Sequence, residues 1–128
     1  MDSKQYRMFT IRVETHFRAS HRLALPDGSM EPAHDHDWLV TADVSRRKLD
    51  EMGIVMSFQK LKAMLDEIIS DFDKTALDTI SYFQRSNSSG ENVAKYIYEK
   101  LRVKLPEGVK LRSVRVMEEP GCWAEFGE

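Results

Sequence analysis

The sequence contains two long stretches in which apolar and polar residues alternate. From Phe9 to His21, the odd positions as far as Phe17 are apolar except for Thr15, and charged or polar side chains occupy the even positions. The stretch from His34 to Val44 follows the same pattern, although Leu39 falls among its polar positions. Alternation of this kind predicts strands with one face against a core. We expect antiparallel strands joined by an unusually long loop, and loops above about 12 residues are often functional.

After these stretches the apolar period changes to three and four residues, which is typical of amphipathic helices. One helix is predicted from Phe58 to Phe72, with Ser57 as its N-cap. A second is predicted to begin near Ser88, where Ser88-Ser89-Gly90-Glu91 has the spacing of a capping box.

Two more strands are predicted near the end of the sequence, one marked by Val109, Leu111, Val114 and Val116 and a short one from Cys122 to Phe126. The resulting order is β-β-α-α-β-β. Segregated strands and helices predict an α+β fold in which the helices cover one face of an antiparallel sheet.

Composition narrows the classes of protein that the chain can belong to. Its 128 residues are expected to form one domain, 1–128, with 41% hydrophobic residues to build a core. The net charge of -2 gives no basic surface for nucleic acid. No apolar run is long enough to span a membrane, Met1 to Arg7 lacks the apolar stretch of a signal peptide, and the single Cys122 cannot form an intrachain disulfide. These features predict a cytoplasmic protein with neither nucleic-acid nor membrane partners.

All four histidines lie between positions 16 and 36. His34 and His36 are two residues apart on a predicted strand, so both side chains leave the same face and can converge on one metal ion. A third ligand would be His21 or His16, but not both, because five residues along a strand place them on opposite faces. Three imidazoles around Zn²⁺ leave a fourth position open, as in catalytic zinc sites. A solvated pair of histidines without a metal is the alternative.

Four motifs, in this order, resemble the 6-pyruvoyltetrahydropterin synthase and 6-carboxytetrahydropterin synthase family. They are Phe17-Arg18-Ala19-Ser20-His21 (F-x-A-x-H), His34-Asp35-His36 (H-G-H), Asn87-Ser88-Ser89-Gly90-Glu91-Asn92 (N-P-T-x-E-N) and Val114-Arg115-Val116-Met117-Glu118 (V-x-V-x-E). The resemblance covers nearly the whole chain. It implies the tunnelling fold, in which three subunits join their sheets into a barrel and two trimers stack into a homohexamer.

The resemblance also implies roles for individual residues. His21, His34 and His36 would bind Zn²⁺. Glu118 would anchor the pterin ring through two parallel hydrogen bonds, a charge-assisted arrangement that is strong and planar.

Two further positions match the family's site. Ser89 would contact the substrate at the start of the second helix, and Asp73 falls where the family has the aspartate of a proton-transferring Asp-His pair.

Several positions depart from the family pattern. Met30 stands where the family has its catalytic cysteine, and Lys74 replaces the histidine after Asp73. Cys122 does not match the cysteine position. However, Glu31-Pro32-Ala33-His34-Asp35-His36 is similar to a branch of the family in which glutamate replaces the cysteine and dihydroneopterin is cleaved to 6-hydroxymethyl-dihydropterin.

The sequence therefore predicts a zinc-dependent pterin enzyme acting on the side chain of 7,8-dihydroneopterin or its triphosphate, with Glu31 and Asp73 as candidate proton-transfer groups. The alternative is a non-catalytic pterin- or purine-binding module that has lost the family cysteine and histidine. A purely structural zinc site would require a fourth protein ligand. Glu31, Asp73 and Glu118 also have a plain alternative as solvated surface carboxylates.

Overall fold

A computed structural model describes residues 7–128 of the chain. The two alternating stretches form the long strands β1 (Phe9–His21) and β2 (His34–Arg46). They pair antiparallel along their whole length, from Phe9 opposite Arg46 to His21 opposite His34. This register places the histidine-bearing ends of the two strands side by side.

Within residues 7–128, three further strands complete a five-stranded sheet in the order β3-β1-β2-β4-β5. The strand β4 (Lys110–Glu119) pairs antiparallel with β2, and β5 (Cys122–Gly127) pairs antiparallel with β4. The two-residue strand β3 (Thr75–Ala76) runs parallel to β1. The β2–β4 register shifts between Asp43 and Val44, which is a β-bulge.

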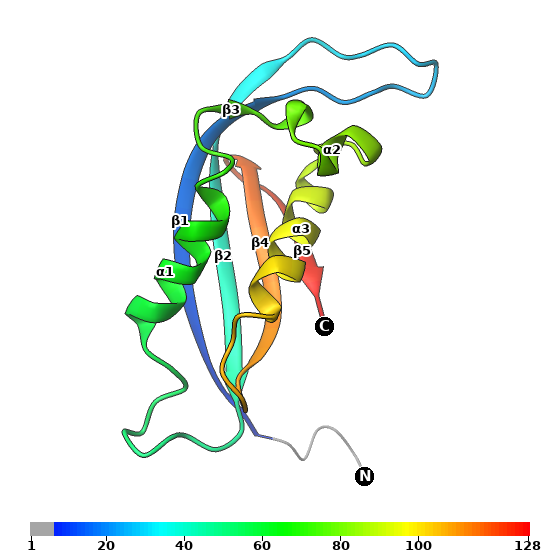
Figure 1. The fold of residues 1–128 in the computed structure, drawn as a ribbon. Helices are drawn as coiled ribbons and strands as arrows, with labels where there is room; N and C mark the ends of the chain where they lie inside the picture. The colour runs from blue at the N-terminus through cyan, green and yellow to red at the C-terminus, as the bar shows by residue number, and fades with distance from the viewer. Residues whose placement is uncertain (1–6) are drawn as a thin grey trace.

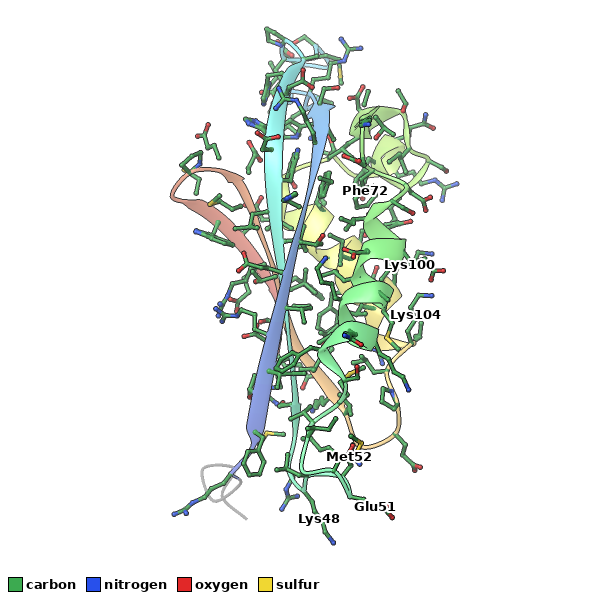
Figure 2. The ribbon with its side chains drawn as sticks, turned by 90° about the vertical axis from the view of Figure 1, so that its left-hand side faces the viewer. Lys48, Glu51, Met52, Phe72, Lys100 and Lys104 are labelled. Atoms are coloured by element: carbon green, nitrogen blue, oxygen red, sulfur yellow. The ribbon has the colours of Figure 1, made fainter. Side chains whose placement is uncertain are left out.

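The predicted helices α1 (Phe58–Ile69) and α3 (Gly90–Arg102) lie side by side on one face of the sheet (Figure 1). The Ser57 hydroxyl caps α1 by accepting a hydrogen bond from the Lys60 amide. The helix ends at Ile69, earlier than predicted, while Phe72 lies fully buried beyond it. Figure 2 shows Phe72 at the upper end of this helical layer, with Met52 at the opposite end of the molecule.

The core lies between the sheet and these helices. It contains the predicted apolar faces of both long strands, including Phe17, Trp38 and Val40, packed against Leu61 and Leu65 of α1. Fully burying each of the large apolar side chains contributes about 1.5–3 kcal/mol, so the alternating pattern fixes which face of the sheet the helices cover.

The other face of the sheet carries charged side chains. Arg12 pairs with Asp43 directly across the β1–β2 ladder, and Arg115 pairs with Glu125 across β4 and β5. The sheet therefore separates an apolar layer from a polar face.

Two short helical turns, η2 (Leu77–Thr79) and α2 (Tyr82–Arg85), connect β3 to α3. The loop 22–33 extends beyond the end of the sheet near α2 (Figure 1). None of the helices among residues 7–128 is long and apolar enough to cross a membrane. The expectation that Met1 to Arg7 is not a signal peptide falls mostly on residues 1–6, which lie outside the described range.

Candidate metal centre

Three of the four histidines meet at one end of the sheet. His21 ends β1, and His34 and His36 begin β2 on the neighbouring strand, so all three rings leave the face that the helices cover. Each ring packs edge-on against the others, with centroids 4.6–5.3 Å apart. His16 lies on the opposite face. His21, and not His16, therefore lies beside His34 and His36.

Hydrogen bonds to backbone carbonyls orient two of the rings. His21 Nδ1 lies 2.6 Å from the Ser88 carbonyl oxygen, and His34 Nδ1 lies 3.1 Å from that of Pro32. An Nδ1–H donated to a carbonyl leaves the Nε2 lone pair free, which is the arrangement that metal-ligating histidines adopt. Nε2 of His21 and Nε2 of His36 are buried and form no hydrogen bond with any of residues 7–128, although a carboxylate oxygen of Glu118 lies 3.5 and 3.4 Å away.

These unpartnered nitrogen atoms fit a metal ion, because a buried polar atom without a partner costs about 1–3 kcal/mol. One ligand atom from each of His21, His34, His36 and Glu118 falls within 4.8 Å of the others. Burial also lowers the pKa of His36, although the nearby Glu118 carboxylate opposes this shift. A neutral imidazole is the form that binds metals.

Trp38 packs against two of the three clustered histidines. It is fully buried, and its indole ring packs edge-on against His21 and His36. The indole N–H donates to the Ala19 carbonyl oxygen at 3.2 Å. This bond fixes the ring and leaves an apolar wall behind the two imidazoles.

Glu118, on β4, lies beside two of the clustered histidines. Its Oε2 lies 3.5 Å from His21 Nε2 and 3.4 Å from His36 Nε2. The carboxylate also lines a cavity of about 210 Å³ together with Gly90, Cys122 and Trp123. A Cβ on Gly90 would lie 3.3 Å from the Ala124 side chain, which is tighter than ordinary contact, and 3.7 Å from Glu118 Oε1, so glycine relieves crowding between α3 and β5 beside the carboxylate.

Glu31 lies in the loop that precedes His34. One of its carboxylate oxygens accepts a hydrogen bond from the Leu23 amide at 3.0 Å, and the Glu31 amide donates to the Leu23 carbonyl at 3.0 Å. Its side chain is half-buried and does not belong to the four-residue cluster. Met30 beside it is exposed.

Asp73 is not brought to the cluster within one chain. Its Oδ1 accepts a hydrogen bond from the Arg18 amide at 3.0 Å. It lines a groove of about 570 Å³ with His16, Arg18 and Asp37, whose side chains leave the polar face of the sheet. Lys74 adopts a φ of 62°, and its amide donates to the Arg18 carbonyl.

Ser89 serves as the N-cap of α3, where its side chain accepts a hydrogen bond from the Asn92 amide at 3.2 Å. The helix thus begins one residue later than a capping box on Ser88 would place it. Ser88 contributes its carbonyl to His21 instead.

Comparison with known proteins identifies the family of the chain. The model of the family described as 6-pyruvoyl tetrahydropterin synthase matches residues 10–128. The chain belongs to this family. The resemblance read from the four sequence motifs is therefore confirmed.

Relatives within the family have several activities. The chain is 32% identical over 116 residues to a putative 6-carboxy-5,6,7,8-tetrahydropterin synthase of Archaeoglobus fulgidus, covering 91% of this chain and 93% of the relative. It is 30% identical over 102 residues to a dihydroneopterin monophosphate aldolase of Pyrococcus furiosus, covering 80% and 82%. The family thus includes enzymes with different products.

Solved structures share the fold. The 6-pyruvoyl tetrahydropterin synthase of Caenorhabditis elegans superposes with a TM-score of 0.83 at 24% identity, covering 95% of this chain and 96% of the other. A Plasmodium vivax 6-pyruvoyltetrahydropterin synthase in which a catalytic glutamate is replaced by alanine gives a TM-score of 0.77 at 18% identity, covering 95% and 98%. The α+β fold predicted from the sequence is confirmed.

Some residues of the candidate site carried no sequence signal of their own. Ser88 contributes a backbone carbonyl, which any residue could supply, and Trp38 reads from its strand position as an ordinary core residue. Cys122 lines the cavity beside Glu118, although it does not match the family cysteine. These contacts depend on the register of β4 and on the path of the chain before α3.

Proposed function

We propose that the chain is a zinc-dependent lyase that cleaves the side chain of 7,8-dihydroneopterin, or a phosphorylated form of it, to 6-hydroxymethyl-dihydropterin. The observation that carries this proposal is the pair of positions 30 and 31. Met30 cannot serve as the family's cysteine, whereas the Glu31 carboxylate is held three residues before His34. The aldolase of Pyrococcus furiosus supports this reaction, and the Plasmodium vivax protein is a precedent for a catalytic glutamate within the same fold.

The proposed zinc ligands are His21, His34 and His36. The free Nε2 atoms of His21 and His36, together with the carbonyl-oriented rings of His21 and His34, support this assignment. Bound at this position, Zn²⁺ would act as a Lewis acid and lower the pKa of the substrate's side-chain hydroxyls. Glu118 lies close enough to two ligands to compete for the role of fourth ligand, so its part must be tested separately.

The proposed reaction is a retro-aldol cleavage. The Glu31 carboxylate takes the proton from the hydroxyl on the second side-chain carbon, and the bond between the first and second side-chain carbons breaks as that second carbon becomes an aldehyde. The electron pair moves into the C6=N5 imine of the ring. The proton then returns to the first carbon. The products are 6-hydroxymethyl-dihydropterin and glycolaldehyde, or its phosphate, so atoms and charges balance with no oxidant.

Asp73 and Ser89 have more distant proposed roles. Asp73 faces the groove on the polar side of the sheet, so it would assist proton transfer only at the site of a neighbouring subunit. Ser89 lies at the start of α3 beside Gly90, which lines the cavity next to Glu118, and we propose that it contacts the pterin there.

We also propose a closed oligomer, most simply a homohexamer built as a dimer of trimers. The edge strand β5 exposes Trp123 at 48% and Phe126 at 36% of their surface. A sheet edge with exposed aromatic residues is a template for pairing with another chain, and barrel closure removes it. Light scattering should therefore give a mass about six times that of the 14.9 kDa chain, whereas a monomer at micromolar concentration would contradict the assembly.

The Glu118→Gln variant should retain zinc and lose pterin affinity. The carboxylate is proposed to accept two hydrogen bonds from the pterin ring, and losing one charge-assisted buried bond typically costs about 1.5–3 kcal/mol, or roughly 10- to 100-fold in affinity. Calorimetry with dihydroneopterin and elemental analysis for zinc measure the two properties. Loss of zinc would instead make Glu118 a fourth ligand and favour a structural metal site.

Product analysis tests the proposed function. The zinc-loaded protein is incubated with dihydroneopterin and separately with its monophosphate and triphosphate, and products are identified by mass spectrometry. We expect 6-hydroxymethyl-dihydropterin, with little 6-pyruvoyl- or 6-carboxy-tetrahydropterin. Efficient formation of either of the latter would overturn the proposal. Tight binding of all three compounds without turnover would favour the non-catalytic binding module, which the absence of the family cysteine and histidine also suggests.

A further inference from the structure

One asparagine holds the loop that carries Glu31. Asn87 Oδ1 accepts a hydrogen bond from the Ala24 amide at 2.8 Å, and Asn87 Nδ2 donates to the Ala24 carbonyl at 3.1 Å. A single side chain thus pairs with both backbone groups of one residue, as a neighbouring strand would. Ala24 in turn forms an isolated β-bridge with Met30 across the loop.

The pairing continues to Glu31 through the adjacent residue. Leu23 donates its amide to the Glu31 carboxylate and accepts the Glu31 amide at its carbonyl, both at 3.0 Å. The carboxylate and the backbone of Glu31 are therefore both tied to the strand of the loop that Asn87 holds.

The segment that carries Asn87 also supports the metal ligands. The next residue, Ser88, gives its carbonyl to His21 Nδ1 at 2.6 Å, and the residue after it, Ser89, caps α3. Asn92, within the first turns of that helix, donates its side-chain amide to the Asn87 carbonyl at 2.9 Å. The segment 87–89 is thus fixed to α3 on one side and contacts both the histidine cluster and the Glu31 loop on the other.

We infer that Asn87 is a positioning residue that sets the placement of Glu31 relative to the histidine cluster. The inference rests on the proposed function where it concerns turnover. The two hydrogen bonds between Asn87 and Ala24, called the clamp below, can be tested without any activity. The loop 22–33 has little regular structure beyond the Ala24–Met30 bridge. Without the two hydrogen bonds between Asn87 and Ala24, the two sides of the loop are joined mainly to each other, and the hydrogen bond between His34 Nδ1 and the Pro32 carbonyl is the contact that still links the Glu31 side of the loop to the cluster. The position of Glu31 relative to the cluster is then less constrained.

The Asn87→Ala variant should lower kcat by about 10- to 100-fold, because a displacement of about 1 Å of a catalytic group has a cost of this size. The KM for dihydroneopterin should change less than about twofold, since the proposed ring anchor, Glu118, lies on β4. Zinc content should stay at the wild-type value. Hydrogen exchange of the Ala24 and Glu31 amides, followed by mass spectrometry or NMR, should become faster.

Two further variants sharpen the test. Asn87→Asp keeps the acceptor for the Ala24 amide and loses the donor, so its kcat and exchange rates should lie between those of the wild type and Asn87→Ala. Gln84→Ala is the matched control. It removes an exposed amide on α2 that makes only a 3.4 Å bond to the Thr79 carbonyl, and it should match the wild type in every measurement.

Each result has a distinct meaning. Unchanged exchange at Ala24 and Glu31 in Asn87→Ala would overturn the clamp, whether or not the protein cleaves dihydroneopterin. Faster exchange with an unchanged kcat would overturn the positioning role. A fall in kcat that follows an equal loss of zinc would also overturn it, because Asn87 would then act on His21 through Ser88. A wild-type protein that makes no 6-hydroxymethyl-dihydropterin would instead contradict the proposed function, and the exchange data would still decide the clamp.

Discussion

The His34→Ala and His36→Ala variants should each lose most of the zinc that the wild-type chain is proposed to bind, at about one ion per subunit. The two side chains leave the same face of β2 and meet His21 across the β1–β2 ladder, so each would supply one of three bonds to the ion. Removing even an outer partner of a metal ligand typically costs about 10- to 100-fold in affinity, and removing a ligand should cost at least as much.

His16→Ala provides the matched control. His16 lies on the same strand as His21 but points to the polar face, where it lines the groove with Asp73. Its loss should leave the zinc content unchanged. His21 is less suitable for the test because it is 1% exposed and packs against Trp38, so its removal also creates a buried cavity.

Elemental analysis after dialysis against a weak chelator measures the zinc content of the wild type and of the His34→Ala, His36→Ala and His16→Ala variants. Full zinc retention in the double variant His34→Ala/His36→Ala would refute the assignment. Turnover of dihydroneopterin should fall in parallel with zinc content in the single variants. Near-normal turnover in a zinc-depleted variant would show that the metal has no part in the reaction.

The sequence could show that His16 and His21 do not share a site, because this depends only on parity, and the resemblance to the family then selected His21. A strand alternates its side chains between two faces, and residues an odd number of positions apart point in opposite directions. The apolar positions of the same strand, such as Phe17, show which face meets the core. The structure places His21 on that face and His16 on the other.

The position of Glu118 could not be derived in the same way. Leu111 and Val114 both face the core although they are an odd number of residues apart, because the bulge opposite Asp43 and Val44 inserts one extra residue into β4. Parity counted from Leu111 would turn Glu118 away from the histidines, whereas parity counted from Val114 or Val116 would turn it toward them, so the alternation alone does not decide. Only the resemblance to the family, or the structure, places it beside them.

The environments of Glu31 and Asp73 depend on contacts that have no local sequence pattern. Each carboxylate accepts a hydrogen bond from a backbone amide, one from Leu23 and the other from Arg18. Backbone partners leave no signature in the sequence, since every residue except proline has an amide. Sequence reasoning named both residues, but it could not show that one chain holds them in different places.

The Glu31→Gln variant should cut the cleavage of dihydroneopterin by about 10²–10⁴-fold, which is the usual contribution of general acid–base catalysis. Glutamine keeps the size and shape of the side chain and can still accept the Leu23 amide through its carbonyl oxygen. It cannot take a proton from the substrate hydroxyl. The loop and the histidine cluster should therefore keep their structure while proton transfer is lost.

Three measurements separate this effect from a structural one. Zinc content and the affinity for dihydroneopterin should match the wild type, whereas single-turnover formation of 6-hydroxymethyl-dihydropterin should be slowed by the full factor. Met30→Ala is the control at the neighbouring position, because an exposed thioether has no proton to transfer and its removal should leave the rate within about twofold. An unchanged rate in Glu31→Gln would remove Glu31 from the mechanism. Asp73 would then be the next candidate, and because it faces the opposite side of the sheet from its own histidine cluster, proton transfer would require a neighbouring subunit.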